Sequence, residues 1–517
     1  MNIDTKGTFT MMNNSKLKHK LITLNICLAM AIFAANALAE EVTAPAAEDE
    51  YTFMDAIKDG KNLTSFRLRY ENVKQDGFQP GNLLGLTGPA NNPTRNEDLK
   101  DAKGLTLRTL LGWQTAPYMN FSFGAQLINV TKFKDDFNDS TNNTEITGVS
   151  NQPRNIEYAK IVDPSETDIN QLYVDWTGIK NTKFRLGRQQ VNLDNVRFIG
   201  DIAYRQVMQV FDGASVLNKS IPDTEVFLAH FEQVKQITTE TRDEGALDIA
   251  NIRYRISPTE FLVGYAYLDG LEDLGLGRAW FGNGGATPAA TAAGKNGTIN
   301  AGADQGNKTF GLRLDGTHPF NPNFRAHYTA EYAKQTDYSG GDSRIDAHYY
   351  KVGGGLGFDN FNMRIDQELL SSNNSKYAFQ TPFGTNHLFQ GWVDKFLATP
   401  VEGIRDTFVT ATYRFDDFTF FADYHIIKSD DDFHTVGSGA ATNGNKFGKE
   451  WNVAATWNID KNWMTKLEYG KFTEDDHYSL LPITAAAATG SATAVANANR
   501  GRVRDTDKLW LTASYTF

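Results

Sequence analysis

Arginines at alternate positions are the residues of this sequence that first suggest a chemistry. Arg67 and Arg69 stand two residues apart between apolar neighbours, and Arg253 and Arg255 repeat the arrangement. Side chains two apart in a β-strand share a face, so the spacing predicts arginines on one face of a sheet. A guanidinium group stays charged and can pair bidentately with a carboxylate. The full set on this polar phase is Arg67, Arg69, Arg185, Arg253, Arg255, Arg313, Arg325, Arg364 and Arg414.

Segments with a two-residue period must position these arginines. Each is about ten residues long, and the other phase carries apolar residues, as in Phe66, Leu68 and Tyr70 or in Phe361, Met363 and Ile365. This alternation is what lipid outside and water inside demand of a membrane strand. We count eighteen such segments, although sixteen is an alternative because the shorter ones are ambiguous. They run over 61–73, 104–115, 119–132, 167–177, 182–192, 211–218, 223–234, 246–256, 259–269, 307–316, 323–336, 346–357, 360–371, 406–415, 418–428, 449–459, 462–472 and 506–517.

The connections between the segments predict an all-β, antiparallel, up-and-down barrel. Several are short polar turns, such as Asn321-Pro322 and Asp359-Asn360, which suit the periplasmic side. The connections near 133–166, 270–306, 372–405, 429–448 and 473–505 are long, and we expect them to be extracellular loops. The final segment alternates from Leu509 to the terminal Phe517, which resembles the signal read by the outer-membrane assembly machinery.

The first forty residues have the layout of a secretory signal peptide. Three lysines at 16, 18 and 20 precede an apolar run from Leu21 to Ala35, and Ala37-Leu38-Ala39 precedes Glu40. We therefore predict a signal peptide over 1–39, a periplasmic segment over 40–60 and an outer-membrane barrel over 61–517. Without residues 1–39 the net charge changes from −11 to −14 and the single cysteine, Cys27, is lost. An acidic, thiol-free chain excludes disulfides and thiolate metal sites and argues against a nucleic-acid partner.

A barrel of this size is expected to enclose an aqueous lumen, so transport is the default hypothesis. A ring of inward arginines would select anions. The alternative is that inward carboxylates neutralise them and leave a polar, weakly selective lumen. The candidates for that role are Asp175, Glu331, Asp366, Asp423 and Glu468.

Two motifs resemble the outer-membrane alginate export family. The first runs from Phe184 to Gly213 and contains Gly187-Arg188-Gln189, Arg197 and Phe211-Asp212-Gly213. The second, from Phe379 to Gly403, contains Gln380-Thr381-Pro382-Phe383-Gly384 and Gly391-Trp392-Val393-Asp394. The resemblance spans nearly the whole mature chain.

The resemblance implies a monomeric, eighteen-stranded barrel whose electropositive constriction passes a polyuronate. Carried over to this sequence, it makes Arg188, Asp194, Arg197 and Arg205 candidates for the constriction. Alternatively, Arg188 and Asp194 form a structural ion pair that holds an infolded segment. Because fold does not fix cargo, we expect a passive channel for anionic oligosaccharides or small organic acids, with alginate as one candidate. We expect no cofactor, and as partners outer-membrane lipid and lipopolysaccharide, the barrel assembly machinery and an anionic solute.

Two other classes of function remain open. A barrel enzyme would need a positioned nucleophile and base, and its histidines, His230, His327, His348, His425 and His477, show no recognisable spacing to such partners. An adhesin or structural barrel would act through its long loops. Two further motifs are weak. The glycine run from Gly353 to Gly357 more often marks a bend or close packing in a strand than a phosphate-binding loop. The run Asp430-Asp431-Asp432 is expected to be a solvated acidic loop, with a calcium site as the alternative.

Overall fold

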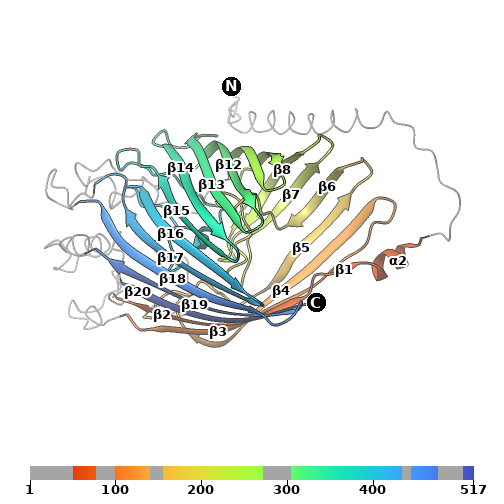
Figure 1. Cartoon of the computed structure of the whole chain (residues 1–517). Helices are drawn as coiled ribbons and strands as arrows, with labels where there is room; N and C mark the ends of the chain where they lie inside the picture. The colour runs from red at the N-terminus through yellow and green to blue at the C-terminus, as the bar shows by residue number, and fades with distance from the viewer. Residues whose placement is uncertain are drawn as a thin grey trace, which may run out of the picture.

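β-strands make up nearly all of the regular structure (Figure 1). The computed structural model describes residues 51–76, 99–139, 155, 157–271, 304–432, 444–475 and 505–517. The signal peptide, most of the 40–60 segment and His477 lie outside these residues. The long strands are β2 (Ser65–Gln75), β3 (Ala102–Gln114), β4 (Phe121–Asp136), β5 (Glu166–Trp176), β6 (Thr182–Gln189), β7 (Val210–Asn218), β8 (Thr224–Lys235), β10 (Leu247–Ser257), β11 (Glu260–Asp269), β12 (Asn307–Asn321), β13 (Phe324–Asp337), β14 (Asp346–Phe358), β15 (Phe361–Leu370), β16 (Ile404–Phe415), β17 (Phe418–Lys428), β18 (Lys446–Asn458), β19 (Trp463–Glu474) and β20 (Thr506–Thr516).

The long strands form one closed antiparallel sheet. Each pairs with its neighbours in chain order, and β20 pairs back onto β2 from Ser65 to Gln75. Two-residue strands, β1 (Lys61–Asn62) and β9 (Thr241–Arg242), only extend β3 and β8. The predicted eighteen-stranded up-and-down barrel is therefore confirmed, and the alternative of sixteen strands is wrong. Closure leaves no strand edge unpaired, which a hydrocarbon environment requires.

The two faces of the barrel follow the predicted alternation. Leu68 and Ile252 are exposed on the outer face, whereas Arg67 and Arg69 are buried on the inner face. Trp451 and Trp457 lie on the outer face of β18, Trp451 in the middle of the strand and Trp457 at its periplasmic end. We call the end with the short turns and Phe517 the periplasmic end and the opposite one the extracellular end, following the usual arrangement of such barrels.

Two connecting segments fold into the barrel and fill much of its interior. The first inner segment, residues 190–209, joins β6 to β7, and the second, residues 371–403, joins β15 to β16 and includes the short 3-10 helix η4 (Asn386–Leu388). Phe198 and Phe379 from these segments pack with inward residues of the wall such as Tyr265 and Tyr349. The prediction that 372–405 is an extracellular loop is therefore wrong, because its aromatic side chains are buried inside the barrel.

A short helix precedes the barrel. Helix α2 (Phe53–Lys58) begins with a capping box, in which Thr52 and Asp55 bond each other's backbone amides. It lies beside the turn between β3 and β4, where Ala116 donates to the Ala56 carbonyl and Phe53 contacts the Phe123 ring (Figure 1). No helix in the described ranges is long and apolar enough to cross a membrane.

We predict that a charge in the middle of the outer face destabilises the barrel far more than one at its end. Leu312, near the middle of β12, is 56% exposed, and Phe320, near the periplasmic end of the same strand, is 60% exposed. Leu312→Arg should cost about 2–4 kcal/mol, whereas Phe320→Arg should cost roughly 0–1 kcal/mol, because an arginine at the interface reaches water. Urea unfolding in lipid vesicles measures both, and equal costs would show that Leu312 does not face hydrocarbon.

Candidate functional site

Three wall arginines hold the first inner segment by its backbone. Arg67 donates to the carbonyl of Ala203 at 2.6 Å and also to that of Arg205, and Arg69 donates to the carbonyl of Tyr204 at 2.7 Å. Arg108 of β3 approaches the Ala203 carbonyl at 3.3 Å. These guanidinium groups therefore anchor a loop.

Arg197 connects the two inner segments to the wall. Its Nε lies 2.8 Å from Glu368 of β15, and both side chains are almost completely buried. Its terminal nitrogens donate to Asn386 and Gln390 of the second inner segment, each at 3.1 Å. Arg197 is thus enclosed by protein and is a structural clamp, since no side of the guanidinium faces open space.

Arg205 is the centre of a second buried junction. It pairs with Glu71 of β2 at 3.0 Å and with Asp394 of the second inner segment at 2.7 Å. Asp394 also contacts Lys508 of β20 at 2.8 Å and His387 Nδ1 at 2.7 Å. Burial raises the pKa of Asp394, but Lys508, His387 and Arg205 outweigh burial and hold that pKa well below its ordinary value.

Stacked rings cross the interior beside this junction. The Tyr204 ring lies under the Arg69 guanidinium at 4.4 Å and stacks on the His387 ring at 3.3 Å between centroids. His387 in turn faces Trp392, which stacks at 4.8 Å on Phe421 of β17. The row therefore links β2 to β17 through both inner segments, and it makes the two segments one packed body.

Most other inward arginines have a carboxylate partner on the wall. Arg185 forms two hydrogen bonds to Asp175 of β5 and lies 3.5 Å above the Tyr173 ring. Arg364 pairs with Asp366, and Arg313 with Asp315 at 3.0 Å. Asp175 and Asp366 thus have the neutralising role that the alternative hypothesis assigned to them. Glu468 instead pairs with Lys466, while Asp423 contacts His425 and Glu331 accepts from Tyr265.

Arg253, Arg255, Arg325 and Arg414 have no carboxylate partner within the described part of the chain. Arg253 lies 3.8 Å above the ring of Phe261. Arg325 binds the amide oxygen of Asn362 and the carbonyl of Asp359, and Arg255 and Arg414 are exposed near the periplasmic end. The charge of the unpaired arginines therefore lies in the periplasmic half of the lumen.

The glycine run in β14 leaves space for these side chains. A Cβ at Gly353 would overlap the carboxylate of Asp366, and a Cβ at Gly357 would overlap the guanidinium of Arg325. The run is therefore a site of close packing within a strand and not a phosphate-binding loop.

Arg188 and Asp194 do not form an ion pair. Arg188 pairs with Asp212 at 2.8 Å and with Asp168 at 3.2 Å. Its direct partner across the strands is Leu172, which is exposed on the outer face, so Arg188 faces outward near the extracellular end of β6. Asp194 lies in the first inner segment and accepts a hydrogen bond from Asn251 at 2.7 Å.

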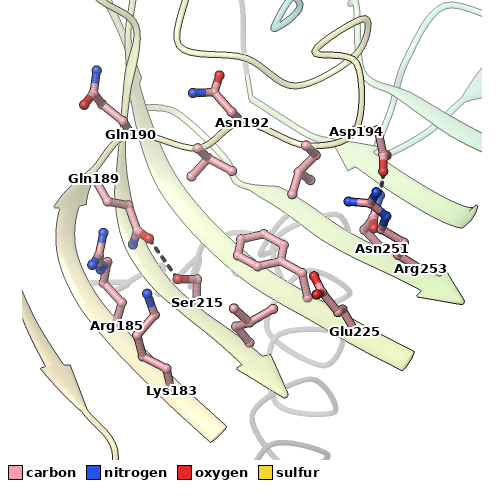
Figure 2. Close-up of a pocket in the computed structure, with 14 residues that line it drawn as sticks. Lys183, Arg185, Gln189, Gln190, Asn192, Asp194, Ser215, Glu225, Asn251 and Arg253 are labelled. Carbon is pink, nitrogen blue, oxygen red and sulfur yellow. Dashed lines mark hydrogen bonds between the residues drawn. The ribbon is translucent and has the colours of Figure 1, made fainter. Parts of the chain in front are cut away.

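A cavity of about 280 Å³ lies between the start of the first inner segment and the inner wall (Figure 2). Its charged residues are Lys183 and Arg185 from β6, Glu225 from β8, Arg253 from β10 and Asp194. The remaining lining consists of amides, a hydroxyl and apolar groups: Gln189, Gln190, Val191, Asn192, Leu193, Ser215, Leu217, Phe227 and Asn251. Figure 2 shows Lys183 and Arg185 on one side of the cavity and Asn251 with Arg253 on the other.

The net charge available in this cavity is positive. Asp175 neutralises Arg185, and Lys219, in the turn after β7, neutralises Glu225 at 2.8 Å. Burial raises the pKa of Asp194 above its ordinary value. Even with Asp194 charged, the four cations Lys183, Arg185, Lys219 and Arg253 exceed the three carboxylates Asp175, Glu225 and Asp194 by one charge. Lys183 and Arg253 remain as two cations without a carboxylate partner in the described ranges.

The histidines have local partners. His425 lies between Asp406 and Asp423, and His230 contacts Asp248 at 2.6 Å. His327 contacts the Thr317 hydroxyl and Asn362, each at 2.9 Å. Asn362 also binds Arg325, so its amide is part of the packing around that arginine.

The acidic run contributes to the second inner segment. Asp430 accepts from the amide of Ser372 at 3.1 Å, and Asp431 from that of Ser375 at 2.7 Å. These carboxylates thus bind backbone, and no cluster of three or more potential metal ligands occurs in the residues that the structure describes.

Of the predicted site residues, the structure brings Arg185, Asp194 and Arg253 to one cavity. It places Arg313 on β12 and Arg364 on β15, elsewhere on the inner wall. Arg67, Arg69, Arg197 and Arg205 hold the inner segments, Arg255 lies at the periplasmic end and Arg188 faces outward. Sequence reasoning missed Arg108 and Lys183, although both fall on the inward phase of predicted strands. It also missed Tyr204 and His387, for which the sequence carries no periodic signal.

We predict that the clamp at Arg197 determines the local stability of the inner segments. Removing one partner of a buried ion pair costs about 3–5 kcal/mol, because it leaves an uncompensated charge. Arg197→Met should therefore speed hydrogen exchange at the amides of both inner segments, whereas Arg188→Met on the outer face should not. If Arg197→Met left this exchange unchanged, the clamp would not hold the segments.

We also predict that acid weakens the junction at His387. Burial lowers the pKa of His387 below its ordinary 6.5. The unfolded chain then binds more protons than the folded one once the pH falls below about 6.5, so stability is lost as the pH falls through the folded pKa. Asp394, whose pKa is also lowered, acts in the same direction at lower pH. The melting temperature should fall from pH 7 to pH 5 by more in the wild type than in His387→Gln, and equal falls would contradict this assignment.

Comparison with known proteins agrees with this architecture. The family model described as "Alginate export" matches residues 123–369, from β4 to β15. Pseudomonas aeruginosa OpdQ has a TM-score of 0.56 at 13% identity and covers 90% of this chain and 99% of its own. Acinetobacter baumannii OccAB4 has a TM-score of 0.53 at 13% identity over 87% and 97% of the two chains. The Pseudomonas aeruginosa outer membrane protein OpdK has a TM-score of 0.53 at 11% identity over 89% and 98%. No curated protein sequence matches. Residues 123–369 thus match the alginate export family model, and the chain that contains them is a closed, eighteen-stranded β-barrel with the fold of outer-membrane proteins such as OpdK.

Proposed function

We propose that this barrel is a channel for anionic solutes and that its cargo is an acidic oligo- or polysaccharide. The observation that carries the proposal is the cavity beside the first inner segment, where Lys183 and Arg253 are inward cations without a carboxylate partner in the described ranges. Positive groups that line a passage favour the entry of anions. The match of residues 123–369 to the alginate export family model supports the same class of cargo.

The rest of the cavity lining fits a carboxylated sugar better than a bare inorganic anion. The ring of Phe227 and the side chains of Leu193 and Leu217 provide apolar surface for the C–H faces of a sugar ring. The amide oxygens of Gln190 and Asn192 each accept one hydrogen bond within the protein, which leaves a second lone pair on each for a sugar hydroxyl. A guanidinium such as that of Arg253, held above the Phe261 ring, has free N–H groups for a carboxylate.

Neutralisation of most inward arginines limits the proposal to this part of the lumen. The guanidinium groups of Arg185 and Arg364 pair with wall carboxylates, and those of Arg197 and Arg205 are buried in the inner segments. Selectivity is therefore expected to depend on Lys183 and Arg253 more than on a complete arginine ring.

We predict that removing these two charges lowers anion selectivity. In planar bilayers under a salt gradient, the reversal potential should indicate anion preference for the wild type, and Lys183→Gln/Arg253→Gln should shift it towards cations. Arg188→Gln is the matched control, because it removes a cation that faces the outside of the barrel. Cation preference of the wild type would refute the assignment as a channel for anions, and no conductance from folded protein would refute any channel function.

The same preparation tests the cargo. Uronic acid oligomers should block the current at lower concentration than neutral oligomers of the same length, and the difference should shrink in Lys183→Gln/Arg253→Gln. Equal block by charged and neutral oligomers would leave an anion channel without preference for acidic saccharides.

A further inference from the structure

On the outer face of the described strands, lysines and arginines are confined to one end of the barrel, whereas at the other end lysines such as Lys180 and Lys461 lie in the turns. The lysines and arginines of the described strands that face outward, by register and alternation, are Lys74, Lys103, Lys134, Arg188, Lys235, Lys308, Lys334, Arg405, Lys428, Lys446, Lys449 and Lys471. All lie within a few residues of the extracellular end of their strand. The periplasmic halves of these strands carry no outward lysine or arginine. A solvated rim would not require this asymmetry, because both ends of a membrane barrel reach water.

On the side of the barrel from β4 to β16 these charges are neutralised, except that of Lys308, which has no ion-pair partner in the described ranges. Lys134 pairs with Asp136, Arg188 with Asp212, Lys235 with Asp168, Lys334 with Asp346 and Arg405 with Asp430. Such surface pairs contribute little to stability. They do cancel the local field, so these strands do not present a net positive surface.

The arc from β17 through β20 to β3 is different. Lys428, Lys446 and Lys449 have no carboxylate partner in the described ranges, and Lys471 lies 3.4 Å from Asp507. Lys74 and Lys103 stand directly opposite Asp507 and Asp136 across the strands but form no ion pair with them. We call these six residues the lysine arc. Lys428 is the direct cross-strand partner of Lys446, and its other cross-strand partner is Arg405. Like charges directly opposite each other are destabilising. No described carboxylate forms an ion pair with Lys428 or Lys446, so an anion from outside the protein would offset this repulsion.

An aromatic row lies immediately below the lysine arc. Tyr424, Trp451 and Tyr469 face outward, with the Trp451 and Tyr469 rings 5.1 Å apart and Tyr424 directly opposite Trp451. Tyrosine and tryptophan rings settle at the level of lipid headgroups. The ammonium groups begin two residues further out on the same strands, where the charged groups of the outer leaflet lie, and their alkyl stems allow them to extend along it.

We propose that the lysine arc binds the phosphate groups of an anionic glycolipid, the lipopolysaccharide of the outer leaflet. The ammonium groups point sideways from the barrel wall, so a component of the same leaflet reaches all of them, whereas a soluble macromolecule would have to displace lipid. A phosphorylated headgroup carries several negative charges on a small area, which matches lysines clustered on adjacent strands. The absence of outward cations from the periplasmic halves assigns the interaction to the outer leaflet alone.

The test is binding of bisphosphorylated lipid A to the purified barrel in a neutral detergent. Native mass spectrometry or thermophoresis should give roughly thirtyfold weaker binding for Lys428→Gln/Lys449→Gln, since each lysine near a charged membrane surface contributes a factor of about five. Binding should weaken with added salt, because exposed charges are screened.

Lys180→Gln/Lys461→Gln is the matched control. It removes the same charge from two turns at the periplasmic end, and it should bind as the wild type does. Heat-modifiable migration on gels verifies folding, and the single variants Lys428→Gln and Lys449→Gln replace the double variant if it does not fold. Unchanged binding by the lysine-arc variants, an equal loss in the control, or equal affinity of the wild type for dephosphorylated lipid A would each overturn the proposal.

Discussion

Buried guanidinium groups in the lumen are the interaction on which the rest of this structure depends. An eighteen-stranded barrel encloses more space than its own inward side chains fill, and two segments of the chain occupy it. These segments have little regular structure, so their backbone carbonyls need donors from elsewhere. Arg67, Arg69 and Arg108 supply those donors from the wall. Because a desolvated guanidinium is costly unless its donors are used, the segment and the arginines fix each other's position.

Carboxylates complete this arrangement at two points. Glu368 meets Arg197, and Glu71 and Asp394 meet Arg205, so both inner segments are tied to opposite parts of the wall and to each other. The stacked rings of Tyr204 and His387 close the contact between the segments. An acidic chain can therefore have many inward arginines and still have a lumen whose charge is mostly balanced.

The alternation of apolar and polar residues made the strands of the wall predictable. The packing inside the lumen was not predictable, because it depends on residues far apart in the sequence. Alternation over ten residues determined which side of each strand faces lipid, and this is why the strand positions and the inward orientation of Arg67, Arg69 and Arg253 follow from the sequence. Whether an inward arginine is free depends on partners far away in the sequence, since Asp394 lies 189 residues from Arg205. Infolding of the second inner segment did have a signal. Phe379, Phe383, Trp392 and Phe396 are too many large apolar residues for a loop that lies in water.

The distribution of charged residues between the inner and outer faces of this barrel says more about its function than the net charge of the chain does. Inside, carboxylates match arginines wherever the inner segments pack, and the described cations that remain unmatched beside the cavity are few. Outside, carboxylates pair with most of the described lysines and arginines from β4 to β16, whereas only Lys471 of the lysine arc has such a partner. Net charge and arginine count average over both surfaces. The two surfaces are separated by a single layer of strands, and alternate residues of one strand contribute to each, so the charge of this protein has meaning only when it is assigned face by face.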